Sequence, residues 1–152
     1  MPISWTSDLN TGIDVIDKQH MRIVDFINDL EIALKSKDKH AIKAVVNDCV
    51  DYTLSHFAFE ESLQEEAGYQ YCKPHKKVHE LFTRKVAEYQ ERLELGDDIG
   101  EELHQMLVRW LINHIKRDDA DYVSAVKTNM IGVIQAKEEK QESKGWFARF
   151  FR

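Results

Sequence analysis

Apolar residues in this 152-residue chain recur every three or four positions, and this spacing constrains the fold more than any other feature. Such a period marks one face of an amphipathic helix. Four stripes of this kind lie at residues 17–36, 42–63, 75–93 and 99–114. Short breaks fall at the polar residues 35–39, at Gly68 and at Gly96, where helices commonly end. The pattern predicts an all-α protein whose four helices form an up-down-up-down bundle.

The segments outside these stripes predict an arm and an extension rather than a second domain. Residues 1–16 have no clear period, and we interpret them as an ordered N-terminal arm lying on the bundle. A further amphipathic stretch from about Tyr122 to Lys140 predicts a C-terminal helical extension. One domain of residues 1–140 agrees with the chain length, and residues 141–152 follow it as a tail.

Composition and charge exclude several classes of protein. Six glycines and two prolines are few for a β-rich or disordered chain. A net charge of −6 argues against a nucleic-acid binder, which normally carries a basic face. No apolar run approaches the roughly 18 residues of a membrane span, and residues 1–20 are too polar for a secretory signal. Because Cys49 and Cys72 form no CxxC pair, we expect reduced thiols and a cytoplasmic protein. Separately, we expect the protein to be a monomer.

Seven histidines are many for a chain of this length, and most of them fall on the apolar stripes. Three stripes carry a histidine followed four or five residues later by another side chain that can bind metal. Residues four apart on a helix turn by only about 40° and rise about 6 Å, so both can reach one point inside a bundle. The pairs are His56 with Glu60, His75 with His79, and His114 with Asp118 or Asp119.

These pairs lie at one height if the helices are antiparallel, because residues equidistant from a short turn then lie side by side. The midpoint between His20 and His56 is residue 38. The midpoints between successive pairs fall at residues 67–68 and near residue 97, so all three midpoints lie at predicted turns. The sequence thus predicts one layer of five histidines and two carboxylates: His20, His56, Glu60, His75, His79, His114 and one of Asp118 and Asp119.

A metal centre explains this layer better than ordinary core packing does. A single histidine on an apolar stripe is more often a hydrogen-bonded core residue, but seven buried ionisable groups without partners would cost about several kcal/mol each. Two metal ions suit seven ligands better than one, and imidazoles with bridging carboxylates favour a pair of irons. His40, beside the first turn, and His104, about 15 Å along the helix from His114, lie outside the layer.

Several segments together resemble the hemerythrin family, specifically the single-domain bacteriohemerythrins, from Trp5 to about Tyr122. The segments are Thr11–Asp14, Ile16–His20, His56–Glu61, His75–Phe82, and Trp110–Ile115 with Asp119. The resemblance implies a non-haem di-iron centre, bridged by an oxo or hydroxo group, that binds dioxygen reversibly. Oxygen storage, transport, delivery and sensing are all compatible with such a centre.

The resemblance also distributes the ligands between two Fe ions. It implies that His75, His79 and His114 hold one iron, that His20 and His56 hold the other, and that Glu60 and Asp119 bridge them. On an ideal helix Asp118 would share the face of His114, whereas Asp119 would be turned about 140° away. Choosing Asp119 therefore implies local unwinding or a π-type turn. The iron with two histidines keeps an open position for dioxygen.

Apolar side chains around this layer are expected to form a dry oxygen pocket. The candidates are Leu111, Ile115, Phe26 and Trp110. Excluding water and protons slows the loss of bound oxygen as peroxide and the oxidation of both irons. By resemblance, Leu111 packs against the oxygen position.

Two other functions use a similar centre: a di-iron oxidase or peroxidase, and a nitric oxide binding protein. Oxygen-activating di-iron sites of the ferritin type use mostly carboxylates with two Glu-x-x-His motifs. Here the one such match, Glu101 with His104, lies off the layer. We therefore expect an oxygen-binding protein without catalytic residues, although the ligands leave residual oxidase or peroxidase activity and nitric oxide binding open.

The last residues form a basic aromatic tail with a different surface from the acidic bundle. Residues 1–143 carry a net charge of −9, and Lys144, Arg149 and Arg152 add three positive charges. The tail could fold back onto the bundle, or it could dock on an anionic membrane or a partner protein. Its aromatic residues are Trp146, Phe147, Phe150 and Phe151.

Overall fold

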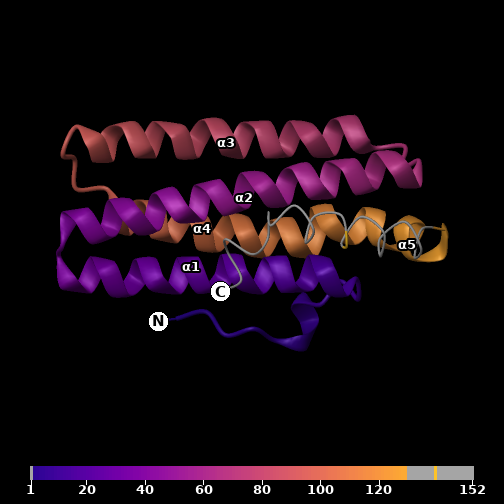
Figure 1. Ribbon diagram of the computed structural model, residues 1–152, viewed down its shortest axis with the longest axis horizontal. Coiled ribbons are helices and arrows are strands. Elements are labelled where there is room, and N and C mark those ends of the chain that lie inside the picture. Colours follow the sequence, from indigo (N-terminus) through magenta and orange to yellow (C-terminus); the bar gives the residue numbers. More distant parts are fainter. Residues whose placement is uncertain (1, 130–138, 140–152) are drawn as a thin grey trace.

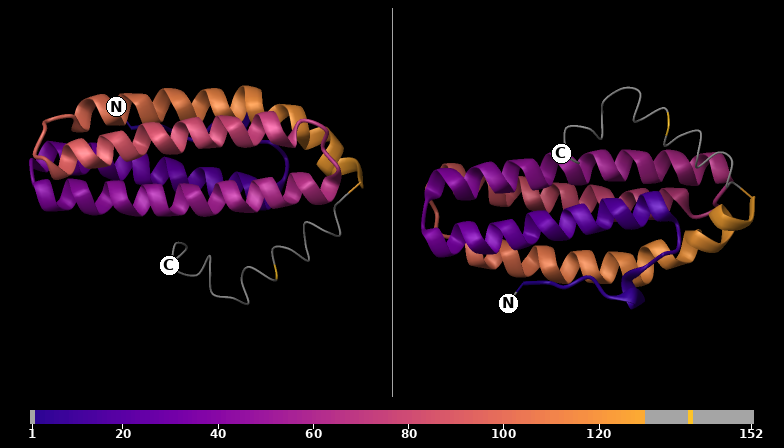
Figure 2. Two further views of the ribbon diagram at one scale, coloured as in Figure 1. Left: turned by 90° about the horizontal axis from the view of Figure 1, so that it is seen from above. Right: turned by 60° about the horizontal axis from the view of Figure 1, so that its bottom comes forward.

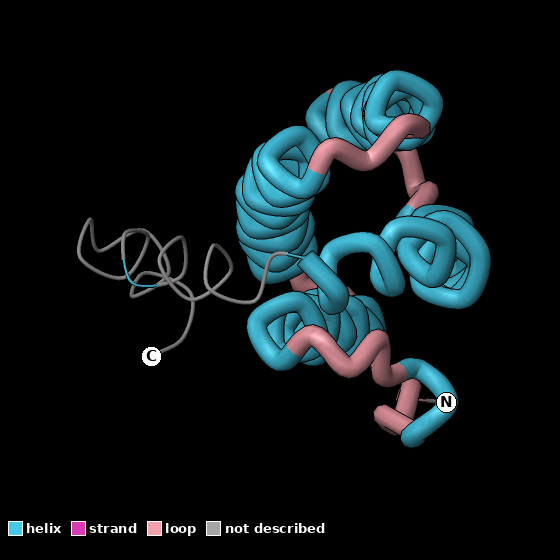
Figure 3. Tube along the Cα trace, turned by 90° about the vertical axis from the view of Figure 1, so that its right-hand side faces the viewer, coloured by secondary structure: helices cyan, strands magenta, loops and turns pink. Residues whose placement is uncertain are grey.

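Four long helices pack side by side in the computed structural model, which describes residues 2–129 and residue 139 (Figure 1). They are α1 (Asp14–Ser36), α2 (Lys39–Ala67), α3 (Cys72–Glu94) and α4 (Gly100–Asn113). Successive helices run in opposite directions and surround a common axis (Figures 2 and 3). This arrangement confirms the predicted up-down-up-down bundle.

The fourth helix is longer than its apolar stripe. After Asn113 the chain continues without a turn through a π-helical segment, η2 (His114–Asp119), into α5 (Ala120–Asn129). The first part of the predicted C-terminal extension is therefore a continuation of the fourth bundle helix. The rest of that extension to Lys140, and the tail at residues 141–152, lie outside the described residues.

The three turns fall where the sequence predicts them. At the first, Lys37 adopts a left-handed conformation (φ 58°), and the Asp38 side chain accepts hydrogen bonds from the first amides of α2. Gly68 ends α2 with φ 69°, a conformation that glycine adopts without steric cost. Gly96 has φ 88° just after the end of α3.

A short N-terminal arm, which contains the 3₁₀ turn η1 (Ser7–Leu9), is tied to α1 by side-chain hydrogen bonds. The Asp17 carboxylate accepts from the Thr11 amide and hydroxyl, both at 2.7 Å, and from the Gly12 amide at 3.1 Å. Nearer the start of the chain, Asn28 exchanges two hydrogen bonds with the backbone of Ile3. The predicted ordered arm is thus confirmed for residues 2–13, whereas residues 14–16, which the prediction also gave to the arm, form the start of α1.

The predicted histidine layer divides the apolar core into two clusters. On one side, between the layer and the turns at Lys37 and Gly96, the core includes Ile27, Tyr52, Val86 and Leu103. On the other side it includes Ile16, Phe59, Leu63, Tyr122 and Val126. The first cluster joins all four bundle helices, whereas the second joins α1, α2 and α5.

Neither a membrane-crossing helix nor a disulfide is found among the described residues. No helix there combines the length and the apolar character that a membrane crossing requires. Cys49 is buried, Cys72 is half-buried, and both are free thiols.

Candidate metal centre

Seven side chains from all four bundle helices meet in one buried layer. Each exposes no more than 5 % of its surface. They are His20 from α1, His56 and Glu60 from α2, His75 and His79 from α3, and His114 and Asp119 from η2. The structure thus brings together all the residues that the sequence placed in the layer.

The two carboxylates divide the histidines into two groups. Glu60 directs Oε2 to His56 Nε2 at 3.2 Å, and Asp119 directs Oδ2 to His20 Nε2 at 3.0 Å. The other oxygen of each carboxylate faces the Nε2 atoms of three histidines. Glu60 Oε1 lies 2.6 Å from His75, 3.1 Å from His79 and 3.5 Å from His114. Asp119 Oδ1 lies 3.1 Å from His114 and 3.4 Å from His75. Each carboxylate therefore reaches from a two-histidine group to a three-histidine group.

The π-helical segment is what brings Asp119 into the layer. A π turn closes between residues five apart, so residue 119 returns to the side of the helix that carries residue 114. Accordingly, Asp119 is fully buried and its Oδ1 lies 3.1 Å from His114 Nε2. The π-type turn expected from the choice of Asp119 is present.

The donor atoms have the spacing and chemistry of metal ligands. With bonds of about 2.1 Å, adjacent ligands of an octahedral ion lie about 3.0 Å apart, close to most of the distances above. The candidate ligand atoms form two overlapping groups, each with all atoms within 4.8 Å of one another. Both Asp119 oxygens and His79 Nε2 are buried without a hydrogen-bond partner among the described residues. Cations would satisfy these atoms.

Burial and charge act in opposite directions on the ionisable groups of the layer. Burial lowers the pKa of His56 to about 4, against the attraction of Glu60. Burial also disfavours the charged form of His75, but its contacts with Asp119 and Glu60 raise its pKa to about 9. Burial would raise the pKa of Glu60, yet the facing imidazoles hold it well below its usual value. At neutral pH these shifts favour an ionised Glu60 beside a protonated His75 in the metal-free layer.

A family model described as the Hemerythrin HHE cation binding domain matches residues 11–126. The chain belongs to the hemerythrin family. This assignment agrees with the resemblance seen in the sequence, and the matched segment contains all seven residues of the layer.

Individual hemerythrin relatives agree in sequence and in structure. A bacteriohemerythrin of Pseudomonas aeruginosa is 54% identical over 145 residues, covering 95% of this chain and 92% of that protein. One from Stenotrophomonas maltophilia is 49% identical over the same shares. A crystal structure of wild-type hemerythrin superimposes with a TM-score of 0.79 at 25% identity, over 83% of this chain and 98% of that one.

Aromatic rings pack against the histidines of this hemerythrin centre. Phe57 stacks on His79 with centroids 3.8 Å apart, and Trp110 stacks on His114 at 4.5 Å. Among the proposed pocket residues, Leu111, Ile115 and Phe26 are buried in the same apolar cluster, and Trp110 packs against that cluster half-buried. The stacking of Phe57 on His79 and of Trp110 on His114 fixes the ring planes of these two candidate ligands.

Two side chains outside the predicted set contact the outer nitrogens of the histidines. Gln19 Oε1 lies 2.6 Å from His56 Nδ1, and Glu61 Oε2 lies 3.9 Å from His79 Nδ1. Both residues stand next to a predicted ligand in the sequence, in Gln19-His20 and Glu60-Glu61. The helical period places them off the metal-facing stripe, which is why the pattern alone gave them no role.

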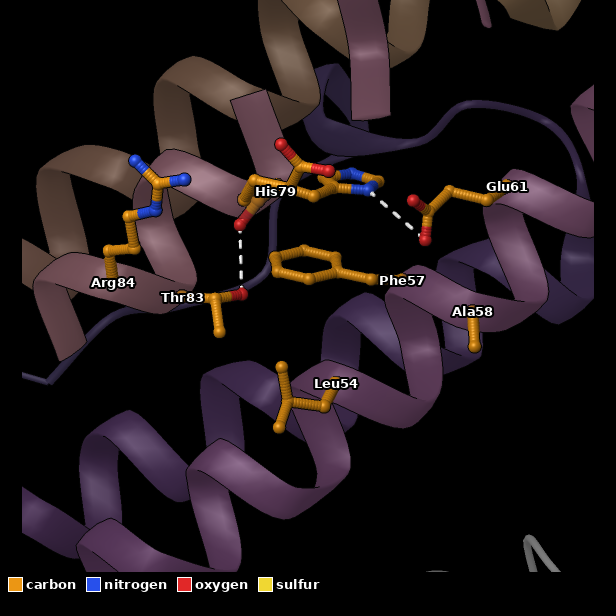
Figure 4. A pocket seen from close by; sticks show the side chains of 8 residues that line it. Leu54, Phe57, Ala58, Glu61, His79, Thr83 and Arg84 are labelled. Atoms are coloured by element: carbon orange, nitrogen blue, oxygen red, sulfur yellow. Dashed lines mark hydrogen bonds and ion pairs between the residues drawn. The ribbon is translucent and has the colours of Figure 1, made fainter. Parts of the chain in front are cut away.

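A cavity of about 310 Å³ lies against the centre between α2 and α3 (Figure 4). Its wall includes His79 itself, and none of the four proposed oxygen-pocket residues lines it. The lining residues are Leu54, Phe57, Ala58, Glu61, His79, Glu80, Thr83 and Arg84. This cavity was not predicted from the sequence.

The two remaining histidines lie where the sequence placed them. His40 is exposed in the first turn of α2. His104 is buried in α4, ten residues before His114, and belongs to neither group of candidate ligands. Both lie outside the centre, as predicted.

Proposed function

We propose that this hemerythrin binds dioxygen reversibly at a non-haem di-iron centre bridged by an oxo or hydroxo group. The observation that carries this proposal is the division of the histidines into groups of two and three by the carboxylates of Glu60 and Asp119. Such a division suits two metal ions that share two bridging carboxylates. The family membership supports the same choice of centre.

The proposed ligand sets differ by one donor. His75, His79 and His114 would hold one iron, His20 and His56 the other, and both carboxylates would bridge. With one bridging oxygen from solvent, the first set supplies six donors and the second supplies five. Two ferrous ions held there would supply the two electrons that dioxygen accepts, and the second ligand set would leave a position for it.

The proposed role of the surrounding residues is to keep water away from that position. Leu111 is buried at the end of α4, Ile115 is buried in η2 beside His114, and Phe26 is buried on α1. Trp110 covers the ring of His114. A dry environment disfavours protonation and release of the bound oxygen.

Oxygen binding is favoured over catalytic turnover by the donor set. Five of the seven candidate ligands are neutral imidazole donors when they bind metal, whereas oxygen-activating di-iron sites of the ferritin type are built mainly from carboxylates. We therefore propose a binding protein for oxygen storage, transport, delivery or sensing rather than an enzyme.

Oxygen consumption by the iron-loaded protein tests this choice. A binding protein should take up about one dioxygen per two irons and then stop, even with an electron donor such as ascorbate present. Continued consumption in proportion to the donor would instead identify an oxidase. Iron analysis on the same sample should give about two irons per chain.

A further inference from the structure

Glu61 follows the proposed bridging residue Glu60 on α2 but serves the opposite side of the neighbouring histidine. Successive residues on a helix are turned by about 100°. Glu60 points into the layer, whereas Glu61 lines the cavity (Figure 4). Its Oε2 is 3.9 Å from Nδ1 of His79, on the far side of the ring from the metal layer. Glu61 is therefore the carboxylate beside the outer nitrogen of this proposed ligand.

That outer nitrogen needs an acceptor. His79 Nε2 lies 3.1 Å from Glu60 Oε1, so Nε2 is the atom that faces the metal layer. A neutral imidazole that binds metal through Nε2 carries its proton on Nδ1. His79 Nδ1 is buried and has no hydrogen bond with a described residue, and a buried N–H without an acceptor is unfavourable.

The His79 ring is held, whereas Glu61 has room to move. Phe57 stacks on the ring with centroids 3.8 Å and planes 7° apart, which restricts the orientation of the ring. Glu61 exposes 21% of its side chain beside a cavity of about 310 Å³. Its carboxylate can close the remaining distance by a change of rotamer or through one bridging water.

We propose that Glu61 is a positioning residue that accepts a hydrogen bond from Nδ1–H of His79 and strengthens this histidine as a metal ligand. The inference rests on the proposed function, because it takes His79 Nε2 as an iron ligand. A carboxylate acceptor fixes the tautomer and the ring orientation and makes the imidazole a stronger donor.

The same interaction distinguishes the two halves of the centre. His56, in the two-histidine group, pairs its Nδ1 with the neutral amide oxygen of Gln19 at 2.6 Å. His79, in the three-histidine group, has an anionic partner instead. A stronger donor favours the more highly charged ion, so Glu61 stabilises the ferric state on the three-histidine side.

A chelator-competition titration of the metal-free protein with Zn²⁺ tests the proposal without iron or oxygen. The test variant is Glu61→Gln, and the matched control is Glu80→Gln, which makes the same charge change at the same cavity, where Glu80 pairs with Lys77 at 3.5 Å. Glu61→Gln should weaken binding of one of two Zn²⁺ ions by about 10–100-fold. The control should bind both ions like the wild type.

A nuclear magnetic resonance measurement on the zinc-loaded protein gives a readout that a purely structural role would not move. The Nδ1–H resonance of His79 should exchange slowly with solvent in the wild type and in Glu80→Gln. In Glu61→Gln it should shift and exchange faster, while the Nδ1–H of His56 stays unchanged.

The outcomes separate this proposal from the proposed function. If the wild type binds two Zn²⁺ ions and Glu61→Gln matches it in affinity and in the His79 resonance, the positioning role is wrong but the metal centre stands. If both variants weaken Zn²⁺ binding equally, the loss of one negative charge at the cavity explains the effect, and the positioning role of Glu61 is wrong. A wild-type protein that binds no metal would contradict the proposed function itself. Thermal unfolding of both metal-free variants checks that they fold.

Discussion

Glu60 and Asp119 direct their carboxylate oxygens to the same two groups of histidines. Glu60 projects from α2 and Asp119 from the π-helical segment of the fourth helix, yet each presents one oxygen to the His20–His56 side and the other to the three-histidine side. Two carboxylates arranged in this way suit a pair of cations better than a single one.

Asp119→Ala should abolish the two-iron centre, whereas Asp118→Ala should leave it intact. Asp119 supplies oxygens to both histidine groups, so its loss removes one of the two proposed bridges. The measurement is the visible oxo-to-iron absorption together with the iron content of each variant. The reverse result, with absorption lost only in Asp118→Ala, would show that the other aspartate is the bridge.

Metal binding should release about one proton near neutral pH, and the apparent affinity should rise with pH. Contacts with Asp119 and Glu60 raise the pKa of His75 to about 9 in the metal-free protein, so a metal ion must displace a proton below that pH. His56, with its pKa lowered to about 4, is already neutral there. Between pH 7 and 9 the affinity should therefore rise by about tenfold per unit.

Calorimetric titration with Co²⁺ in buffers of different ionisation enthalpy counts the protons released. His75→Ala should bind more weakly and lose most of this proton release. An affinity that does not change from pH 7 to 9 would contradict the assignment of the bound proton to His75.

Leu111→Ala should accelerate autoxidation of the oxygen-bound protein. Leu111 is 1% exposed and precedes His114 by one helical turn, so its truncation opens space beside the centre for water. The loss of a buried leucine should also lower the free energy of unfolding by about 2–5 kcal/mol. The decay of the oxy spectrum measures the autoxidation rate.

A control separates the pocket effect from instability. Leu107→Ala removes a buried leucine one turn farther from the centre and should be destabilised to a similar extent. Its autoxidation rate should stay close to that of the wild type. Equal rates in Leu111→Ala and the wild type would mean that Leu111 does not protect the oxygen position.

Asp17→Ala should release the N-terminal arm from the bundle. The buried carboxylate accepts three hydrogen bonds from Thr11 and Gly12, and their loss should lower the free energy of unfolding by about 2–4 kcal/mol. Asp14→Ala, which removes an exposed carboxylate paired with Lys18, should cost at most about 1 kcal/mol. Urea unfolding measures the free energy of unfolding of both metal-free variants. A similar loss of stability in the two variants would refute the anchoring role of Asp17.

The sequence was sufficient to predict the helices and the height of the layer because both follow from spacing. Turns at Gly68 and Gly96 fix which residues of neighbouring helices lie side by side, and the apolar period fixes which of them face inward. The π-type turn did not follow from spacing, which left Asp118 and Asp119 open; it was expected only because the family resemblance selected Asp119.

The outer contacts of the histidines could not be predicted in the same way. Gln19, although fully buried, and Glu61 both lie off the metal-facing stripe, and their roles depend on rotamers and on how closely the neighbouring helices approach. The cavity beside His79 depends on side-chain packing between α2 and α3, which no periodicity encodes. Such features require three-dimensional coordinates.

Oxygen titration of the anaerobically reduced, iron-loaded protein tests the central claim most directly. Visible spectra should show an oxy form that saturates at about one dioxygen per two irons. Removal of oxygen under argon should restore the reduced spectrum over repeated cycles. Irreversible oxidation on the first exposure, or saturation at a different ratio of dioxygen to iron, would contradict reversible binding at a di-iron centre.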